Sequence, residues 1–143
     1  MNLKTFTWIY GLVFTLIGIL GFVPGITQPH ENPNVALDAG LGTLFGLFPV
    51  NYLHNVIHLA FGLWALWLVR QTVSDNARRS YAKTVAVVYL VLALMGIFPF
   101  LNTTFGLVPI YGHDIWLHAV LGLGAAYFGF AYGRSRDTVT APR

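Results

Sequence analysis

The chain has 143 residues, of which 56% are hydrophobic and only 9% are charged, and it contains no cysteine. Soluble domains carry about 25% charged residues, so this composition predicts an integral membrane protein; the lack of cysteine excludes disulfides, thiolate metal sites and cysteine nucleophiles. The formal net charge is +3, but no soluble segment is long enough to present a basic face, so we expect no nucleic-acid partner.

Four apolar segments are each close to the roughly 20 residues that a helix needs to span a bilayer. They cover residues 6–23, 50–69, 84–101 and 110–132. The first follows Lys4 as a secretory signal would, but its apolar stretch is too long and no small-residue cleavage site follows, so we expect a retained transmembrane helix. Because little chain remains outside these segments, residues 1–143 are expected to form a single transmembrane domain.

The basic residues all fall on one side of the membrane in this arrangement. They precede the first segment, separate the second from the third, or follow the fourth: Lys4, Arg70, Arg78, Arg79, Lys83, Arg134, Arg136 and Arg143. The positive-inside rule then predicts a four-pass protein of the plasma (inner) membrane with both termini in the cytoplasm. The lipid bilayer is its expected partner, and the sequence leaves open a homo-oligomer or a larger membrane complex.

The two outer loops contain proline and short apolar runs. Residues 35–47 form an apolar stretch too short to span the membrane, for which we expect a short helix at the membrane interface. Pro49 and Pro109 are predicted in the first turn of the helix that follows each of them, where proline is tolerated.

Residues 43–62 resemble residues 103–122. The two stretches share Thr, Phe, Gly, Leu, Pro, His and Gly at aligned positions, which indicates an internal duplication. The repeats would cover about residues 6–70 and 82–134. We therefore predict an all-α, integral membrane four-helix bundle, built from two tandem transmembrane helical hairpins with a pseudo-two-fold axis along the membrane normal. The second and fourth helices would face each other across that axis.

Each copy of the repeat carries two potential metal ligands four residues apart. His54 aligns with Asp114, and His58 aligns with His118. This spacing places both side chains of a pair on one face of a helix, within the outer half of the membrane, where ionisable residues are costly and usually functional. Three imidazoles and one carboxylate suit a divalent transition metal, with zinc expected first and iron or manganese as alternatives.

Other interpretations of these four residues remain open at the level of sequence. They would also serve, as less favoured alternatives, as a metal-free polar network that joins two helices, and His58 with His118 would suit the two axial positions of a haem or pigment in an accessory subunit. A metal-dependent hydrolase would need a general base besides Asp114, so the sequence favours a protein that is not an enzyme, with no catalytic residue assigned. Three neighbouring residues are candidates for contacts that orient the ligands: Asn51, Asn55 and His113.

Several of these motifs occur together in a known pattern. Gly46-Leu47-Phe48-Pro49-Val50, then Leu53-His54-Asn55 with His58-Leu59, then Asp114 with Trp116-Leu117-His118 resemble an uncharacterised bacterial membrane family, domain of unknown function 4383. The second motif of that family usually reads Ala-Asp-Asn-Trp-Leu-His, and here His113 and Ile115 replace the Ala and the Asn. The resemblance implies a four-helix membrane topology and no established activity.

Overall fold

A computed structural model describes residues 1–133, which form four long helices and three short strands. Helix α1 (Leu3–Leu20) packs along α2 (Tyr52–Arg70), and α3 (Asp75–Ile97) packs along α4 (His113–Ala126). The last helix continues as a π-helical turn, η1 (Tyr127–Ala131). All four helices are long and apolar enough to cross a membrane, so the prediction of a four-pass helical membrane protein is confirmed at this level. The pseudo-two-fold symmetry of the two hairpins stays a prediction.

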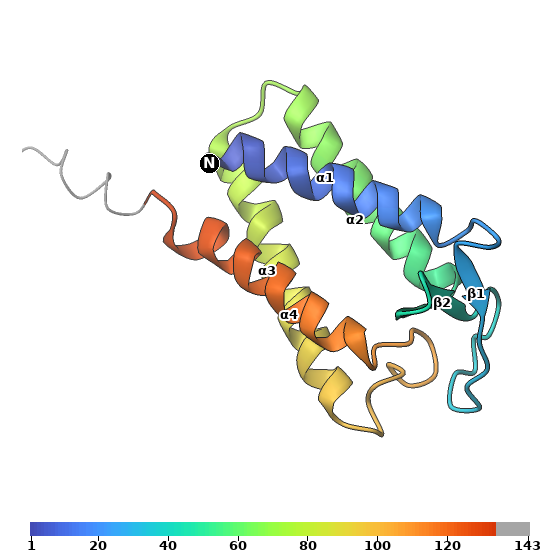
Figure 1. The fold of residues 1–143 in the computed structure, drawn as a ribbon. Coiled ribbons are helices and arrows are strands. Elements are labelled where there is room, and N and C mark those ends of the chain that lie inside the picture. Colours follow the sequence, from blue (N-terminus) through green and yellow to red (C-terminus); the bar gives the residue numbers. More distant parts are fainter. Residues whose placement is uncertain (134–143) are drawn as a thin grey trace, which may run out of the picture.

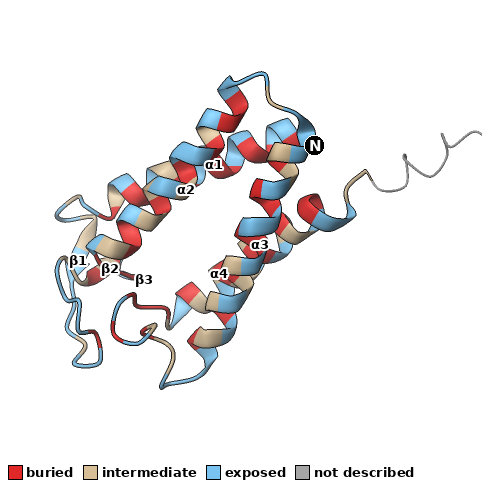
Figure 2. Ribbon diagram, turned by 180° about the vertical axis from the view of Figure 1, so that it is seen from behind, coloured by how far each residue is buried: buried red, intermediate tan, exposed pale blue. Residues whose placement is uncertain are grey.

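The two helix pairs meet at one end and diverge at the other. They lie closest near the N-terminus of α1 and separate toward the end that carries the strands (Figure 1). An aromatic core joins them: Phe6 stacks on Phe128 with ring centroids 4.5 Å apart, and Phe14 stacks on Tyr89 at 5.1 Å. Buried positions run along the inner side of each helix and exposed ones along the outer side (Figure 2). Many exposed side chains are apolar, such as Leu16, as expected for helices that face lipid.

Helix α3 begins earlier than the sequence predicted. The prediction placed its start at residue 84, but the helix starts at Asp75, directly after Ser74, which occupies the N-cap position, and it ends at Ile97. Arg78, Arg79 and Lys83 therefore lie within α3 and not in a loop between the second and third helices. Hydropathy missed this first part because charged residues lower the apolar average, although Arg and Lys favour helix as strongly as most apolar residues do.

The prediction of an interfacial helix at residues 35–47 is wrong, because these residues form no helix. This loop instead contributes to a three-stranded antiparallel sheet, β1 (Thr27–Pro29), β2 (Gly42–Leu44) and β3 (Phe48–Val50), in the order β1-β2-β3. Phe45 and Gly46 turn the chain between β2 and β3 with left-handed backbone angles, φ of 55° and 70°. Paired positive φ values match the turn that joins two adjacent strands, and a helix cannot continue through them.

The prolines also lie outside the helices that follow them. Pro49 pairs with Thr43 in the sheet, and α2 starts only at Tyr52, after the N-cap Asn51. Pro109 likewise precedes the start of α4 at His113. The prediction that both prolines occupy a first helical turn is therefore wrong, because Pro49 lies within β3 and Pro109 lies in an irregular segment before α4.

Aligned positions of the two repeat copies share local geometry. Phe105 and Gly106 have positive φ values of 60° and 86°, like Phe45 and Gly46 in the first copy. Gly62 and Gly122 both lie where a helix meets its packing partner, and an added side chain would collide with Thr15 in one case and Leu90 in the other. These similarities agree with a duplication, which remains an interpretation of the sequence.

Candidate metal centre

Four ionisable side chains gather where the helix pairs diverge. His54 and His58 project from the first two turns of α2, and Asp114 and His118 project from the first two turns of α4. Each pair has the four-residue spacing that puts two side chains on one helical face. All four side chains are buried, with at most 5% of the residue exposed. The two helices therefore approach each other here through side chains that a membrane protein rarely buries.

Three of the four lie close enough to share an ion. One ligand atom from each of His54, Asp114 and His118 lies within 4.8 Å of the others. Two ligands of a tetrahedral zinc ion, each about 2.1 Å from the metal, are about 3.4 Å apart. Small side-chain rotations would therefore close the group around a metal ion. The sequence named these three residues as ligands, and the structure brings them together.

His58 lies beside this group without belonging to it. Its ring centroid is 4.7 Å from that of His54 and 6.4 Å from that of His118. Phe14 contacts the His58 ring edge-on, with centroids 5.7 Å apart. The fourth residue that the sequence named is thus a neighbour of the three.

The ring orientation of two histidines is fixed by the backbone. His58 Nδ1 lies 3.2 Å from the carbonyl oxygen of His54, and His118 Nδ1 lies 2.9 Å from that of Asp114. A carbonyl oxygen only accepts hydrogen bonds, so Nδ1 of each ring carries the proton and donates it. Nε2 of each ring then keeps a free lone pair. This arrangement, in which one ring nitrogen donates to the protein, is typical of histidines that bind a metal through the other nitrogen.

Several polar atoms of the group are buried without a hydrogen-bond partner among the described residues. They are both ring nitrogens of His54 and Oδ2 of Asp114. Oδ2 lies 3.3 Å from His118 Nδ1, but that nitrogen donates to the backbone oxygen. An unpaired polar atom in a buried site costs about 1–3 kcal/mol, and a charged one more. A cation held by these atoms would remove that cost, so the residues present fit a metal ion.

An aromatic wall closes one side of the group. The Tyr89 ring of α3 stacks on His118 with centroids 4.6 Å apart and an angle of 21° between the planes. Tyr89 also meets His58 edge-on at 6.3 Å. These contacts hold the imidazoles in place and keep water out on this side. No sequence motif points to Tyr89, because its position opposite His118 depends on how α3 and α4 pack.

Asn51 was expected to orient a ligand, and in the structure it is the N-cap residue of α2. Its Oδ1 accepts the backbone N–H of His54 at 2.9 Å. Its amide nitrogen donates to two loop carbonyls, Leu37 O at 2.8 Å and Leu107 O at 2.7 Å. One buried side chain therefore joins the start of α2 to both outer loops directly beside His54. Sequence reasoning missed this link, since neither loop partner carries a recognisable motif.

Asn55 and His113, the other two residues expected to orient the ligands, lie in different surroundings, one buried and one exposed. Asn55 is fully buried beside Gly21, and neither of its amide atoms has a hydrogen-bond partner within residues 1–133. His113 is exposed, and its Nδ1 accepts a hydrogen bond from Trp116 Nε1 at 3.2 Å. The structure thus places Asn55 in the protein interior and leaves His113 apart from the buried group.

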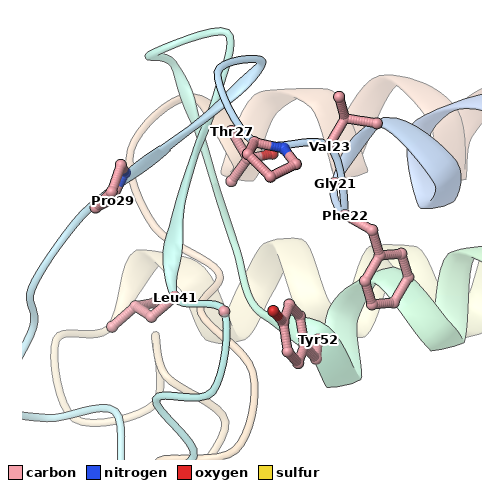
Figure 3. A pocket seen from close by; sticks show the side chains of 9 residues that line it. Gly21, Phe22, Val23, Thr27, Pro29, Leu41 and Tyr52 are labelled. Carbon is pink, nitrogen blue, oxygen red and sulfur yellow. The ribbon is translucent and has the colours of Figure 1, made fainter.

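A small pocket of about 70 Å³ reaches the group, with His54, His58 and Asp114 in its lining. A larger hollow of about 170 Å³ lies elsewhere, between the end of α1 and Tyr52 (Figure 3). That hollow is bordered by Phe22, Thr27 and Leu41 and contains none of the candidate ligands. Of these two pockets, only the smaller one is therefore lined by candidate ligands.

The comparisons with known proteins identify a family and no function. The model of the family described as "Domain of unknown function (DUF4383)" matches residues 4–131, so the chain belongs to this family. The searches of curated proteins and of solved structures found no match.

Proposed function

We propose that this member of the family is a multi-pass membrane protein that binds one divalent transition-metal ion between α2 and α4. His54, Asp114 and His118 are the ligands. The supporting observation is the convergence of these three buried residues within 4.8 Å, with both ring nitrogens of His54 and one oxygen of Asp114 unpaired. A packing network would pair its polar atoms with each other, whereas a ligand set keeps them free for the ion.

Zinc is the metal that we propose first. Two imidazoles and one carboxylate are a common zinc ligand set, and they leave one of four tetrahedral positions open. Iron and manganese accept the same donor atoms and are the alternatives. His58, which the sequence named as the fourth ligand, lies beside the group of three but outside it, so the fourth position is open. The single carboxylate leaves the loaded site with a net charge of about +1, which lowers the cost of holding a divalent cation in an apolar environment.

The ion would link the helix pairs where they diverge. Two of its ligands, Asp114 and His118, belong to α4, and the third, His54, belongs to α2. The positive-inside rule puts this end of the molecule at the outer face of the plasma membrane. The role proposed is structural, sensory or in support of a partner complex, and not enzymatic. Metal-assisted hydrolysis would also require a general base. Asp114 is already a ligand, which leaves His58 as the candidate among the described residues beside the ion.

The haem alternative is disfavoured by space. The ring centroids of His58 and His118 are 6.4 Å apart, as two axial ligands would need, but aromatic side chains of the core pack around them. The adjoining pocket of about 70 Å³ is far smaller than a tetrapyrrole. A colourless purified protein would agree with the metal site and disagree with haem.

Metal content tests the proposal. The full chain would be purified in detergent without chelators and without a histidine tag, and its metals measured by mass spectrometry before and after incubation with zinc. We expect about one equivalent of zinc per chain after incubation. His54→Gln and His118→Gln should each reduce it to a fraction of an equivalent, since each removes one ligand nitrogen.

His113→Gln is the matched control, because His113 is a histidine on α4 that lies outside the buried group. It should bind as much zinc as the unchanged protein. Less than a tenth of an equivalent in the unchanged protein, even after incubation with zinc, iron or manganese, would overturn the metal site. Equal loss in all three variants would overturn the ligand assignment.

A further inference from the structure

We propose that the pocket beside the metal centre delivers a small, uncharged, largely apolar ligand to the open position of the ion. This inference rests on the metal site proposed above and assigns its ligand class. Its source is the geometry of one pocket, whose inner end is formed by candidate ligands and whose other walls are apolar.

The pocket joins the metal centre to the protein surface. His54, His58 and Asp114 form its polar end. The apolar walls come from three separate elements, with Ile17 on α1, Leu117 on α4 and the β2–β3 hairpin between them. Phe45, at the tip of that hairpin, lines the pocket and is 56% exposed. A ligand passing Phe45 therefore meets apolar side chains until it reaches the buried histidines.

The ligand atoms are distributed unevenly around this pocket. His54 and Asp114 border it, whereas His118 is not part of its lining. An ion held by all three residues consequently has His118 on the side away from the pocket. Its open fourth position faces the pocket, where His54 also has ring nitrogens without a partner among residues 1–133.

The size and the polarity of the pocket limit what it can accept. An apolar cavity of about 150 Å³ holds a benzene molecule, so 70 Å³ suits a body of roughly two to four heavy atoms. The apolar walls offer nothing to replace the hydration of a charged group, which disfavours anions. The ligand class is thus a small neutral molecule with one donor atom for the metal and an apolar remainder.

The backbone at Phe45 is held in an unfavourable conformation. A left-handed backbone is sterically unfavourable for a residue other than glycine, and Phe45 has a φ of 55°. Such strain is often found next to functional sites. Phe105 has nearly the same geometry, with a φ of 60°, but it does not line this pocket. The left-handed turn alone therefore does not mark a pocket residue. Phe45 differs from Phe105 because it lines the pocket beside the candidate ligands.

Cobalt provides the optical signal for the test. Cobalt(II) replaces zinc at sites of this kind. A thiol that enters the pocket as the neutral molecule binds the ion as the thiolate, releases its proton to the buffer, and adds a charge-transfer band in the near ultraviolet. The full chain in detergent, loaded with cobalt, would be titrated with propane-1-thiol and with 2-mercaptoethanol. These probes have the same donor and the same number of heavy atoms, and differ only in a methyl group replaced by a hydroxyl. We expect propane-1-thiol to bind at least tenfold more tightly.

The more apolar thiol also concentrates in the detergent. A pair of variants separates this effect from binding in the pocket. Leu117→Phe fills the pocket from α4, and Leu123→Phe makes the same substitution on the same helix at a position that is 62% exposed. Leu117→Phe should weaken propane-1-thiol binding at least tenfold and leave the cobalt stoichiometry unchanged. Leu123→Phe should change neither. Ile17→Phe, from α1, repeats the pocket-filling test on a helix that carries no metal ligand.

The outcomes separate the two proposals. Failure to bind cobalt at all would overturn both the metal site and its ligand class. Cobalt binding with equal affinity for the two thiols, or with propane-1-thiol affinity unchanged in both pocket-filling variants, would overturn the ligand class and leave the metal site standing.

Discussion

Asp114 is the residue that best distinguishes the two interpretations of the buried group, a metal site and a packing network. In the predicted duplication Asp114 aligns with His54, and the carboxylate at this position lies in the protein interior. One of its oxygens has no hydrogen-bond partner among residues 1–133, although His118 is close. A bound cation would stabilise this charge, whereas burial without a cation is unfavourable.

Replacing Asp114 with Asn therefore has opposite effects on stability and on metal binding. The metal-free protein should become more stable by roughly 1–3 kcal/mol, since a buried charge with an unpaired oxygen is replaced by a neutral amide of the same shape. Zinc affinity should fall by more than about 100-fold, because even changes behind the ligands cost 10–100-fold. Thermal unfolding of metal-free protein and zinc titration measure the two effects. A variant that loses stability and keeps its zinc affinity would indicate a packing network.

The sequence could predict the residues of the site but not their surroundings. The four-residue spacing and the duplication were enough to name His54, Asp114 and His118, which the structure brings together. His58 was named with them and lies just outside the group of three. The contact of Tyr89 with His118 was missed, because such contacts depend on the angle and the register between helices. Hydrophobic periodicity alone fixes neither.

The long helices were predictable and the outer loops were not. Hydropathy located all four helices, since a span of about 20 apolar residues is a strong signal. The stretch at residues 35–47 is apolar too, but Gly40, Gly42 and Gly46 interrupt it. Glycine disfavours a helix and permits the left-handed turn at Phe45–Gly46. Weighing these glycines against the apolar content would have favoured the β2–β3 hairpin.

The start of α2 depends on one side chain. Asn51 caps the helix and also holds the carbonyls of Leu37 and Leu107, so its replacement by Ala removes three hydrogen bonds together. We expect Asn51→Ala to reduce the free energy of unfolding by roughly 2–4 kcal/mol, and to weaken zinc binding because His54 lies in the first turn. Asn2→Ala is the control. It removes an exposed cap on α1 and should cost about 1 kcal/mol.

Unfolding of the two variants would be followed by circular dichroism during titration with denaturing detergent. Equal, small effects of Asn51→Ala and Asn2→Ala would show that the link between the loops contributes little. In that case the arrangement of the outer end would depend on the sheet and on the helix packing instead.

The molecule as a whole has one charged end and one end that carries the candidate centre. Lys4, Arg70 and the basic residues at the start of α3 lie at the end where the helix pairs meet, and the strands and the buried group lie at the other. The positive-inside rule predicts that the basic end lies in the cytoplasm. The metal centre and its pocket would then be supplied from outside the cell.

The absence of native cysteine allows a direct test of this orientation. Asn34→Cys introduces a thiol in the long outer loop, and Ser74→Cys introduces one between α2 and α3; both positions are exposed. A membrane-impermeant maleimide should label Asn34→Cys in intact cells and Ser74→Cys only after lysis. The reverse pattern would place the metal centre on the cytoplasmic side.

X-ray absorption at the zinc edge is the sharpest test of the metal centre, because it reports the atoms around the ion itself. For the zinc-loaded protein we predict nitrogen and oxygen neighbours at about 2.0–2.1 Å, with the outer-shell pattern of at least two imidazoles. That pattern should weaken in His54→Gln and His118→Gln and persist in His113→Gln. A zinc ion surrounded by oxygen atoms alone, with no imidazole signal, would contradict the assignment of the buried group as a metal centre.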